Sequence, residues 1–283
     1  MWCASLDAAD ITCGFARPPL LTGTYHSPIS RYCAAVASAK LPAMTNHAKE
    51  EMEHARAHHA PNRSLARRAQ MWLDRQLHTL RTAMDIARDK RIAGVSLEEN
   101  VISPFAQTHG AIDTIHTPYG TLGVVLGAEE FKPSDVILDV GCGLGRPLAY
   151  LVGAGFPGKI VGVEINPAVA ARAAAWTQRY DNVSVFSSDV FLIDLSKYTH
   201  FFMWRPFTPD AFARFVAKLE AEVVHPVRVY YLSDTHTGDL LEERPGWTIV
   251  RRAWVHRVHG IPQHGEPERY TVWDYAPQTS QRR

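Results

Sequence analysis

The side chains best placed for chemistry are three acids that each follow a short apolar run. The runs are "VILD", ending at Asp139, "IVGVE", ending at Glu164, and "VSVFSSD", ending at Asp189. Acids that follow successive strands of one parallel sheet meet along one edge of that sheet, where open α/β folds bind their ligands. The spacing therefore predicts a polar ligand at this edge.

The first acid leads into a glycine turn, "DVGCGLGRP", which contains Gly141, Gly143 and Gly145. A dinucleotide site needs a third glycine where Arg146 stands, and a Walker phosphate loop is excluded because no Gly-Lys-Ser/Thr follows. A carboxylate at Asp139 would repel a diphosphate and attract an ammonium group. We expect the turn to hold the amino-acid end of a ligand.

The other two acids suit the rest of such a ligand. Glu164 could accept hydrogen bonds from both hydroxyls of a ribose, as acids at this position do in dinucleotide sites. Asp189 could accept a hydrogen bond from an adenine amino group, with the backbone N–H of Val190 beside it, and Asp194 is the alternative for this role. An amino acid, a ribose and an adenine in this order describe S-adenosylmethionine.

The runs "LDVGCGLG", "VGVEIN" and "SSDV" resemble motifs of the class I S-adenosylmethionine-dependent methyltransferases, and the resemblance covers about residues 115–275. It implies a Rossmann-like fold and S-adenosylmethionine as the cofactor. It also implies that Tyr119, upstream of the first strand, closes over the amino-acid end of the cofactor. The implied cofactor-binding residues are Asp139, Gly141 and Gly143 for the methionine part, Glu164 for the ribose, and Asp189 with Val190 for the adenine.

The acceptor side is expected at the end of the fourth strand, in "FFMWRPF". Some amino-methylating members of the family carry an acid or amide, two prolines and an aromatic residue there. Here Arg205 replaces the acid or amide and one proline is absent, so a nitrogen acceptor is not implied. Trp204 and Phe207 could form an aromatic wall beside the sulfonium, and Arg205 could hold a substrate carboxylate. The alternative is that the aromatics belong to the core and Arg205 points to solvent.

One further residue is a candidate general base. His236 lies in "YLSDTHTGD", after the fifth predicted strand, and would act only on an acceptor that must lose a proton. A carboxylate or phenolate acceptor needs no such base.

The elements that position these residues alternate between strands and helices from Val136 onward. Strands are expected at 136–140, 160–164, 183–186, 200–204 and 227–232, and helices at about 144–154, 167–179 and 208–221. "WTIVRRAWVHRV" and "RYTVWDYAP" then form two strands without an intervening helix. We therefore predict an α/β fold with a seven-stranded, mostly parallel Rossmann-like sheet that ends in an antiparallel hairpin.

A helical extension is expected before this sheet. Apolar residues recur at three- and four-residue spacing between residues 63 and 92, which predicts an amphipathic helix whose other face carries arginines. That arginine face is expected to contact solvent or an acidic partner. The predicted organisation is a poorly ordered leader over 1–60, a helical extension or lid over 61–112, and an S-adenosylmethionine-binding domain over 113–283.

Composition narrows the partners. The chain has 46% hydrophobic residues and a formal net charge of +1, so neither nucleic acid nor a membrane is expected as a partner. The four cysteines form no CxxC pair, and the paired histidines His54 and His58 and the cluster His256, His259 and His264 lack a further ligand at familiar spacing. We expect no metal and a cytoplasmic location.

These inferences predict a methyltransferase that acts on a small or medium-sized organic acceptor. Two alternatives stay open at this point. One is methylation of a nitrogen in a protein, peptide or nucleic acid. The other is a catalytically silent subunit that binds the cofactor and acts through a partner.

Overall fold

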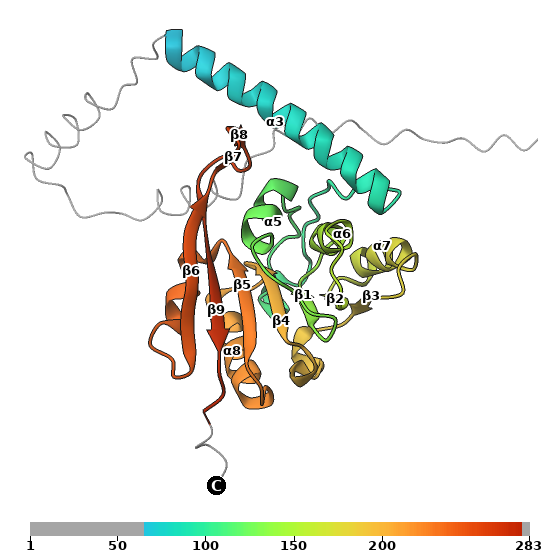
Figure 1. Cartoon of the computed structure of the whole chain (residues 1–283), viewed down its shortest axis with the longest axis vertical. Coiled ribbons are helices and arrows are strands. Elements are labelled where there is room, and N and C mark those ends of the chain that lie inside the picture. Colours follow the sequence, from blue (N-terminus) through green and yellow to red (C-terminus); the bar gives the residue numbers. More distant parts are fainter. Residues whose placement is uncertain (1–64, 279–283) are drawn as a thin grey trace, which may run out of the picture. The chain divides into compact units, whose positions relative to one another are not determined.

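The structure is a computed structural model that describes residues 65–278. One seven-stranded sheet has the order β3-β2-β1-β4-β5-β9-β6, and β9 runs antiparallel to both of its neighbours (Figure 1). The predicted sheet and its closing hairpin are confirmed. The strands are β1 (Val136–Val140), β2 (Lys159–Glu164), β3 (Val183–Ser187), β4 (His200–Trp204), β5 (Val227–Leu232), β6 (Trp247–Val255) and β9 (Glu268–Tyr275). Between β6 and β9, β7 (Arg257–Val258) and β8 (Ile261–Pro262) form a small second hairpin.

Helices connect the parallel strands as expected. The helices after β1, β2 and β4 are α6 (Arg146–Gly153), α7 (Pro167–Thr177) and α8 (Pro209–Glu222). Before the sheet lie α3 (Leu65–Ile92), α4 (Ala106–His109) and α5 (Tyr119–Leu126). Short 3-10 turns are η1 (Val190–Leu192), η2 (Leu195–Lys197), η3 (Asp234–His236) and η4 (Gly238–Leu241). Local chemistry sets these starts: α7 begins at Pro167, and the Asn166 side chain caps it by accepting the Ala168 N–H.

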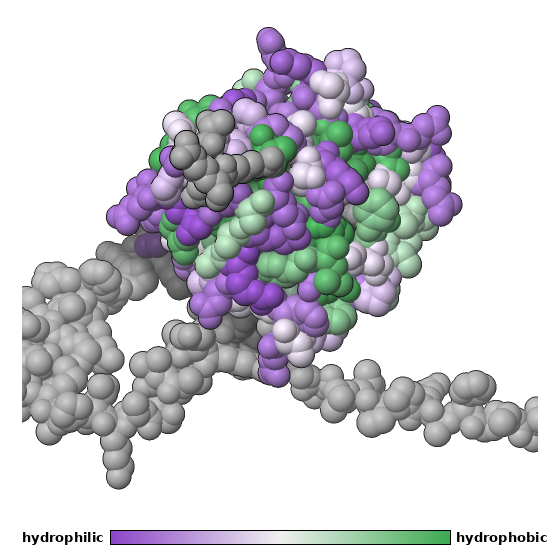
Figure 2. Space-filling view, turned by 90° about the horizontal axis from the view of Figure 1, so that it is seen from below, coloured by the Kyte–Doolittle hydropathy of each residue, from purple (hydrophilic) through white to green (hydrophobic). Residues whose placement is uncertain are grey.

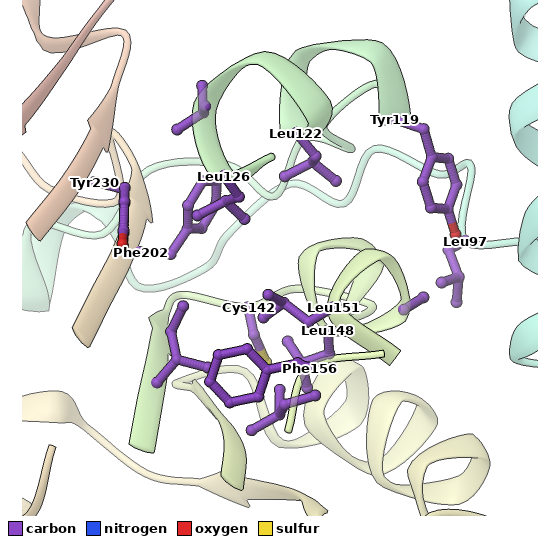
Figure 3. Close-up of a cluster of buried hydrophobic side chains, with 14 of the residues drawn as sticks. Leu97, Tyr119, Leu122, Leu126, Cys142, Leu148, Leu151, Phe156, Phe202 and Tyr230 are labelled. Carbon is purple, nitrogen blue, oxygen red and sulfur yellow. The ribbon is translucent and has the colours of Figure 1, made fainter. Parts of the chain in front are cut away.

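The sheet has a hydrophobic core on each face. Side chains alternate along a strand, so Ile137 packs in one core while Leu138 and Val140 pack in the other. Helices α5 and α6 contribute Leu122 and Leu148 to the first core (Figure 3). Burial on both faces explains why the central strands are nearly continuous apolar runs, and it fixes the strand ends that carry the polar residues.

The orientation of α3 differs from the prediction. Its apolar residues Trp72 and Leu80 are 63% and 53% exposed, whereas its polar residues Arg81, Asp85 and Asp89 are buried. The physical reason is that these polar side chains form ion pairs on the inner side of the helix, which the apolar periodicity could not reveal. The helix packs against β8 and α6 through this polar side (Figure 1).

The surface viewed from the side opposite the top of Figure 1 is mixed. Hydrophilic residues cover much of it, and hydrophobic residues lie between them (Figure 2). Among the described residues, none of the helices has the length and apolar character needed to cross a membrane.

Candidate active site

A pocket lies at the carboxyl ends of β1, β2, β3 and β4. Its volume, including space open to solvent at the mouth, is about 950 Å³. Parallel strands β1 and β4 lie side by side, but their following helices α6 and α8 are separated, which opens a crevice at this edge. The structure brings most of the predicted residues together here. Those in the lining are Asp139, Gly141, Glu164, Asp189, Val190, Trp204, Arg205 and Phe207.

Asp139 is the most buried acid of the pocket, with 3% of its surface exposed. Its Oδ2 has no hydrogen-bond partner among the described residues. Burial, and then the nearby charge of Glu164, raise the pKa of Asp139 well above its ordinary value. A buried carboxylate oxygen without a partner would be stabilised by a cation in the pocket, as expected for the amino group of an amino acid.

Glu164 holds the glycine turn from the end of β2. Its Oε2 accepts the Gly143 N–H at 3.0 Å, and its Oε1 accepts the Asn166 N–H at 2.8 Å. Burial raises the pKa of Glu164, and these backbone hydrogen bonds offset part of that rise. Each carboxylate oxygen has a second lone pair, so Glu164 can still accept from ribose hydroxyls.

The turn itself requires glycine. Gly141 and Gly143 have φ values of 73° and 55°, in the left-handed region. A Cβ on Gly143 would lie 2.4 Å from the Cγ2 of Thr114, and one on Gly145 would lie 3.1 Å from Trp176. Gly143 is absent from the pocket lining and acts through its N–H bond to Glu164, and Gly145 packs closely against Trp176.

Asp189 and Asp194 occupy similar local positions but different surroundings. Asp189 caps η1 by accepting the Phe191 N–H at 3.0 Å through Oδ1, and it lines the pocket beside Val190. Asp194 caps η2, is exposed, and is not part of the lining. Of the two candidates for the adenine, only Asp189 is in position.

A segment upstream of the sheet covers the end of β4. The Ile112 N–H donates to the carbonyl of Pro206 at 3.0 Å, the Thr208 N–H donates to the carbonyl of Gly110 at 2.8 Å, and Ala111 pairs with Phe207. This pairing joins residues 109–114 to the turn after β4, and residues of both segments line the pocket as one wall.

Arg205 has an unusual backbone. Its φ is 37°, and the proline that follows disfavours helical conformations at the preceding residue. Strain of this kind costs about 1–3 kcal/mol and persists where the surroundings fix the chain. Arg205 is a residue of the pocket lining, and its side chain has no hydrogen bond or ion pair with any described residue. Its guanidinium is therefore available to an anionic ligand.

Trp204 packs against His264, which lies just after β8. The ring of His264 meets the Trp204 ring edge-on, with centroids 5.6 Å apart, and its Nε2 lies 2.8 Å from the hydroxyl of Thr121. Burial, followed by the charges of Arg81 and neighbouring histidines, lowers the pKa of His264 to about 4. A neutral His264 therefore packs against Trp204 at pH 7.

A buried ion cluster, which the sequence did not indicate, lies next to the turn. Arg146, whose side chain is 1% exposed, binds Asp89 at 2.6 Å and Glu98 at 2.7 Å. Glu98 also meets His116 at 2.7 Å. Burial would raise the pKa of Glu98, but hydrogen bonds from His116 and Arg146 outweigh it and lower this pKa to about 2. The cluster fastens the segment after α3 to the start of α6.

Two predicted residues lie elsewhere. Tyr119 is the first residue of α5 and is buried, with Arg88 4.9 Å from its ring centroid. Its side chain points toward Leu97 rather than into the pocket (Figure 3). His236 is exposed in η3, which follows β5, and β5 lies one strand farther from β1 than β4 does. His236 is not in the lining, so its expected role as a base has no support in this geometry.

Metal and cysteine chemistry can be checked only in part. No group of three potential metal ligands occurs among the described residues, and the described cysteine, Cys142, is a buried free thiol. The predicted leader, with Cys3, Cys13, Cys33, His54 and His58, lies outside the described residues.

Comparisons with known proteins concern the domain family and the fold. The family model described as "Methyltransferase domain" matches residues 138–200. A methyltransferase from Pyrococcus furiosus superposes with a TM-score of 0.50 at 12% identity, covering 70% of this chain and 98% of that one. An RNA methyltransferase from Salinibacter ruber, in complex with S-adenosylhomocysteine, superposes with a TM-score of 0.45 at 18% identity, covering 59% of this chain and 97% of that one. No curated protein matches the chain. At these identities the structural likeness shows the fold alone.

Proposed function

Because the chain carries a class I S-adenosylmethionine-dependent methyltransferase domain, we propose that it methylates a small or medium-sized organic molecule with an anionic group. The observation that carries the proposal is Arg205, a residue of the pocket lining whose guanidinium makes no hydrogen bond or ion pair with the described residues. A fork-shaped guanidinium binds a carboxylate through two parallel hydrogen bonds and so orients the molecule that bears it.

The residues of the other half of the pocket fit the cofactor, S-adenosylmethionine. The cofactor supplies a methyl group on a positively charged sulfur. We propose that Asp139 binds its amino group, Glu164 its ribose, and Asp189 with Val190 its adenine. The unpartnered Oδ2 of Asp139 supports the first assignment, and the spare lone pairs of Glu164 support the second.

The acceptor half supports a closed site for a compact acceptor. Residues 109–114 pair with the turn after β4, so the two segments form one continuous wall on the acceptor side of the pocket. Alignment and exclusion of water are the main contributions a protein makes to a direct displacement. We propose an oxygen acceptor such as a carboxylate or phenolate, because Arg205 stands where amino-methylating members carry an acid or amide, and because such an acceptor needs no base while His236 lies outside the pocket lining.

The test is to incubate the full chain with methyl-labelled S-adenosylmethionine and a fractionated extract. Label in the small-molecule fraction supports the proposal. Label in polypeptide or nucleic acid contradicts it, and tight binding of S-adenosylhomocysteine without any labelling favours a silent cofactor-binding subunit. An Arg205→Lys variant, tested on the labelled fraction, should raise the KM of the acceptor and leave the affinity for S-adenosylhomocysteine within about twofold.

The proposal also covers the domain boundaries and the location of the protein. We place the domain boundaries near residues 60 and 112, the second of which falls within the pocket wall at 109–114. We also propose a cytoplasmic location, which keeps the buried Cys142 thiol reduced.

A further inference from the structure

The outer face of α3 is apolar over most of the helix. Leu65, Trp72, Leu73, Leu80 and Met84 are all exposed, and their spacing of seven, one, seven and four residues places them on one side of the helix. The single aromatic residue among them, Trp72, is 63% exposed. A stripe of five large apolar side chains on one helix is more than the scattered exposure of a typical surface.

The charges of α3 are sorted between its two sides. Its three acids turn inward: Asp74 binds Arg257 at 2.5 Å, Asp85 binds Arg81 at 2.8 Å, and Asp89 binds Arg146. The exposed cations beside the apolar stripe are Arg68, Arg75, Lys90 and Arg91. Because α3 has no other acid, its outer face combines apolar and positively charged side chains without a carboxylate.

We propose that this outer face of α3 binds peripherally to an anionic lipid surface. An apolar centre with a tryptophan, flanked by arginines and lysines, is the pattern of helices that lie in the membrane interface. Anionic headgroups would attract the marginal cations while the apolar stripe enters the boundary of the acyl chains. At 1.5 Å per residue the 28-residue helix offers a contact about 42 Å long.

Other occupants fit less well. A second copy of the chain would bring two positively charged faces together. A nucleic acid would contact cations at the centre of the face, where this helix carries Trp72, Leu73 and Leu80. A protein partner needs a groove that matches a single convex helix, whereas a fluid lipid surface adapts to it. The net charge of +1 is an average over the whole chain, so it does not exclude a positively charged surface on one side of α3.

This surface is separate from the proposed catalytic function. No residue of α3 is in the lining of the pocket, so changes on its outer side test lipid binding without altering the active site. A methyltransferase held at a membrane would meet acceptors that partition there, but the proposal stands whether or not the acceptor does.

The experiment is sedimentation of the full chain with phosphatidylcholine vesicles, with and without phosphatidylglycerol. We expect binding to the phosphatidylglycerol vesicles that weakens as salt rises, and little binding to phosphatidylcholine alone. A Trp72→Ser, Leu80→Ser double variant and an Arg68→Glu, Arg75→Glu double variant should each lower the partition coefficient about tenfold or more. The matched control is Trp254→Ser, which removes a tryptophan that is 59% exposed on β6, and it should bind like the wild type.

Tryptophan emission gives a second measurement. The emission should shift to shorter wavelength on the anionic vesicles, and Trp72→Phe should remove most of that shift. Equal vesicle binding by the wild type and both double variants would overturn the proposal. Equal binding to vesicles with and without phosphatidylglycerol would overturn it as well. Loss of a dimer, or of RNA binding, in the variants without any effect on vesicles would assign the face to those partners instead. Each variant should retain its affinity for S-adenosylhomocysteine within about twofold, which shows that it is folded.

Discussion

The two halves of the pocket are built in different ways. The half proposed for the cofactor consists of residues that end β1, β2 and β3, so the sheet itself sets their positions. The half proposed for the acceptor pairs residues 109–114 with the turn after β4, and this wall depends on hydrogen bonds between segments about 95 residues apart, such as Ile112 to Pro206. The comparison suggests that cofactor binding tolerates little change, whereas acceptor choice can change through one segment.

The largest expected effect is in the cofactor half. Glu164→Ala should weaken S-adenosylhomocysteine binding about 100-fold or more, because it removes the ribose acceptor and the support of the Gly143 N–H together. Titration calorimetry measures the affinity, and circular dichroism checks that the variant is folded. Glu164→Gln keeps one acceptor oxygen and should lose less. An affinity within about twofold of wild type in Glu164→Ala would mean that the ribose lies elsewhere.

The next largest effect is expected at Arg205 in the acceptor half, where a substitution should lower activity and raise stability. Arg205→Gly should lower kcat/KM about 30-fold by removing the anion-binding guanidinium. It should also raise the free energy of unfolding by about 1 kcal/mol, because glycine adopts a φ of 37° without strain. Urea unfolding and steady-state kinetics measure the two. Arg205→Lys retains charge and strain, so it should show no gain in stability. A Gly variant that is fully active would place the substrate anion elsewhere.

The third prediction tests the charge of Asp139 in the cofactor half. Asp139→Asn should weaken S-adenosylhomocysteine binding about tenfold at neutral pH, since the ligand ammonium loses its carboxylate. The pKa of Asp139 is raised in the folded state, so the wild type loses stability as pH rises through that raised pKa. The Asn variant should therefore be the more stable protein at neutral pH.

The pH dependence supplies the control for this prediction. Below the ordinary pKa of 3.8 the Asp139 carboxyl is protonated in both the folded and the unfolded state, so the stability difference between the two proteins should disappear. Thermal unfolding across this range measures it. A wild type that stays more stable than the variant at neutral pH would show that Asp139 has a partner in the folded protein.

The sequence predicted the two halves unequally. Asp139, Glu164 and Asp189 could be placed because each follows an apolar strand, and parallel strands bring their ends together. The wall at 109–114 could not, because its pairing with residues 206–208 is a contact between distant segments without periodicity. Gly110 was a signal in hindsight, since its φ of 66° and close approach to Thr208 require glycine.

The misplaced residues have physical causes too. The apolar period of α3 was correct, but it predicted the wrong side for burial, because buried ion pairs of Asp85 and Asp89 outweigh the apolar stripe. Tyr119 was assigned by its place upstream of β1, whereas α5 turns it toward α3, under Arg88. Arg146 was read only as a missing glycine, and its ion pairs could not be inferred from its neighbours in the sequence.

The smallest expected effect tests whether the halves can be separated. Glu98→Gln weakens the link between the segment after α3 and Arg146, and through it the support of the wall at 109–114. We expect the KM of the acceptor to rise about fivefold, for about 1 kcal/mol of lost ion pairing, with the affinity for S-adenosylhomocysteine unchanged within about twofold. Glu99→Gln is the matched control, because Glu99 binds Arg172 at a half-exposed position where an ion pair contributes little.

Acid unfolding gives an independent measurement on the same variant. The pKa of Glu98 is lowered from 4.5 to about 2, so its contribution to stability is present above 4.5 and is lost as pH falls toward 2. The wild type should therefore lose its stability advantage over Glu98→Gln in that window. If cofactor affinity fell as much as acceptor affinity in Glu98→Gln, the buried cluster would position the glycine turn as well, and the pocket would respond as one unit.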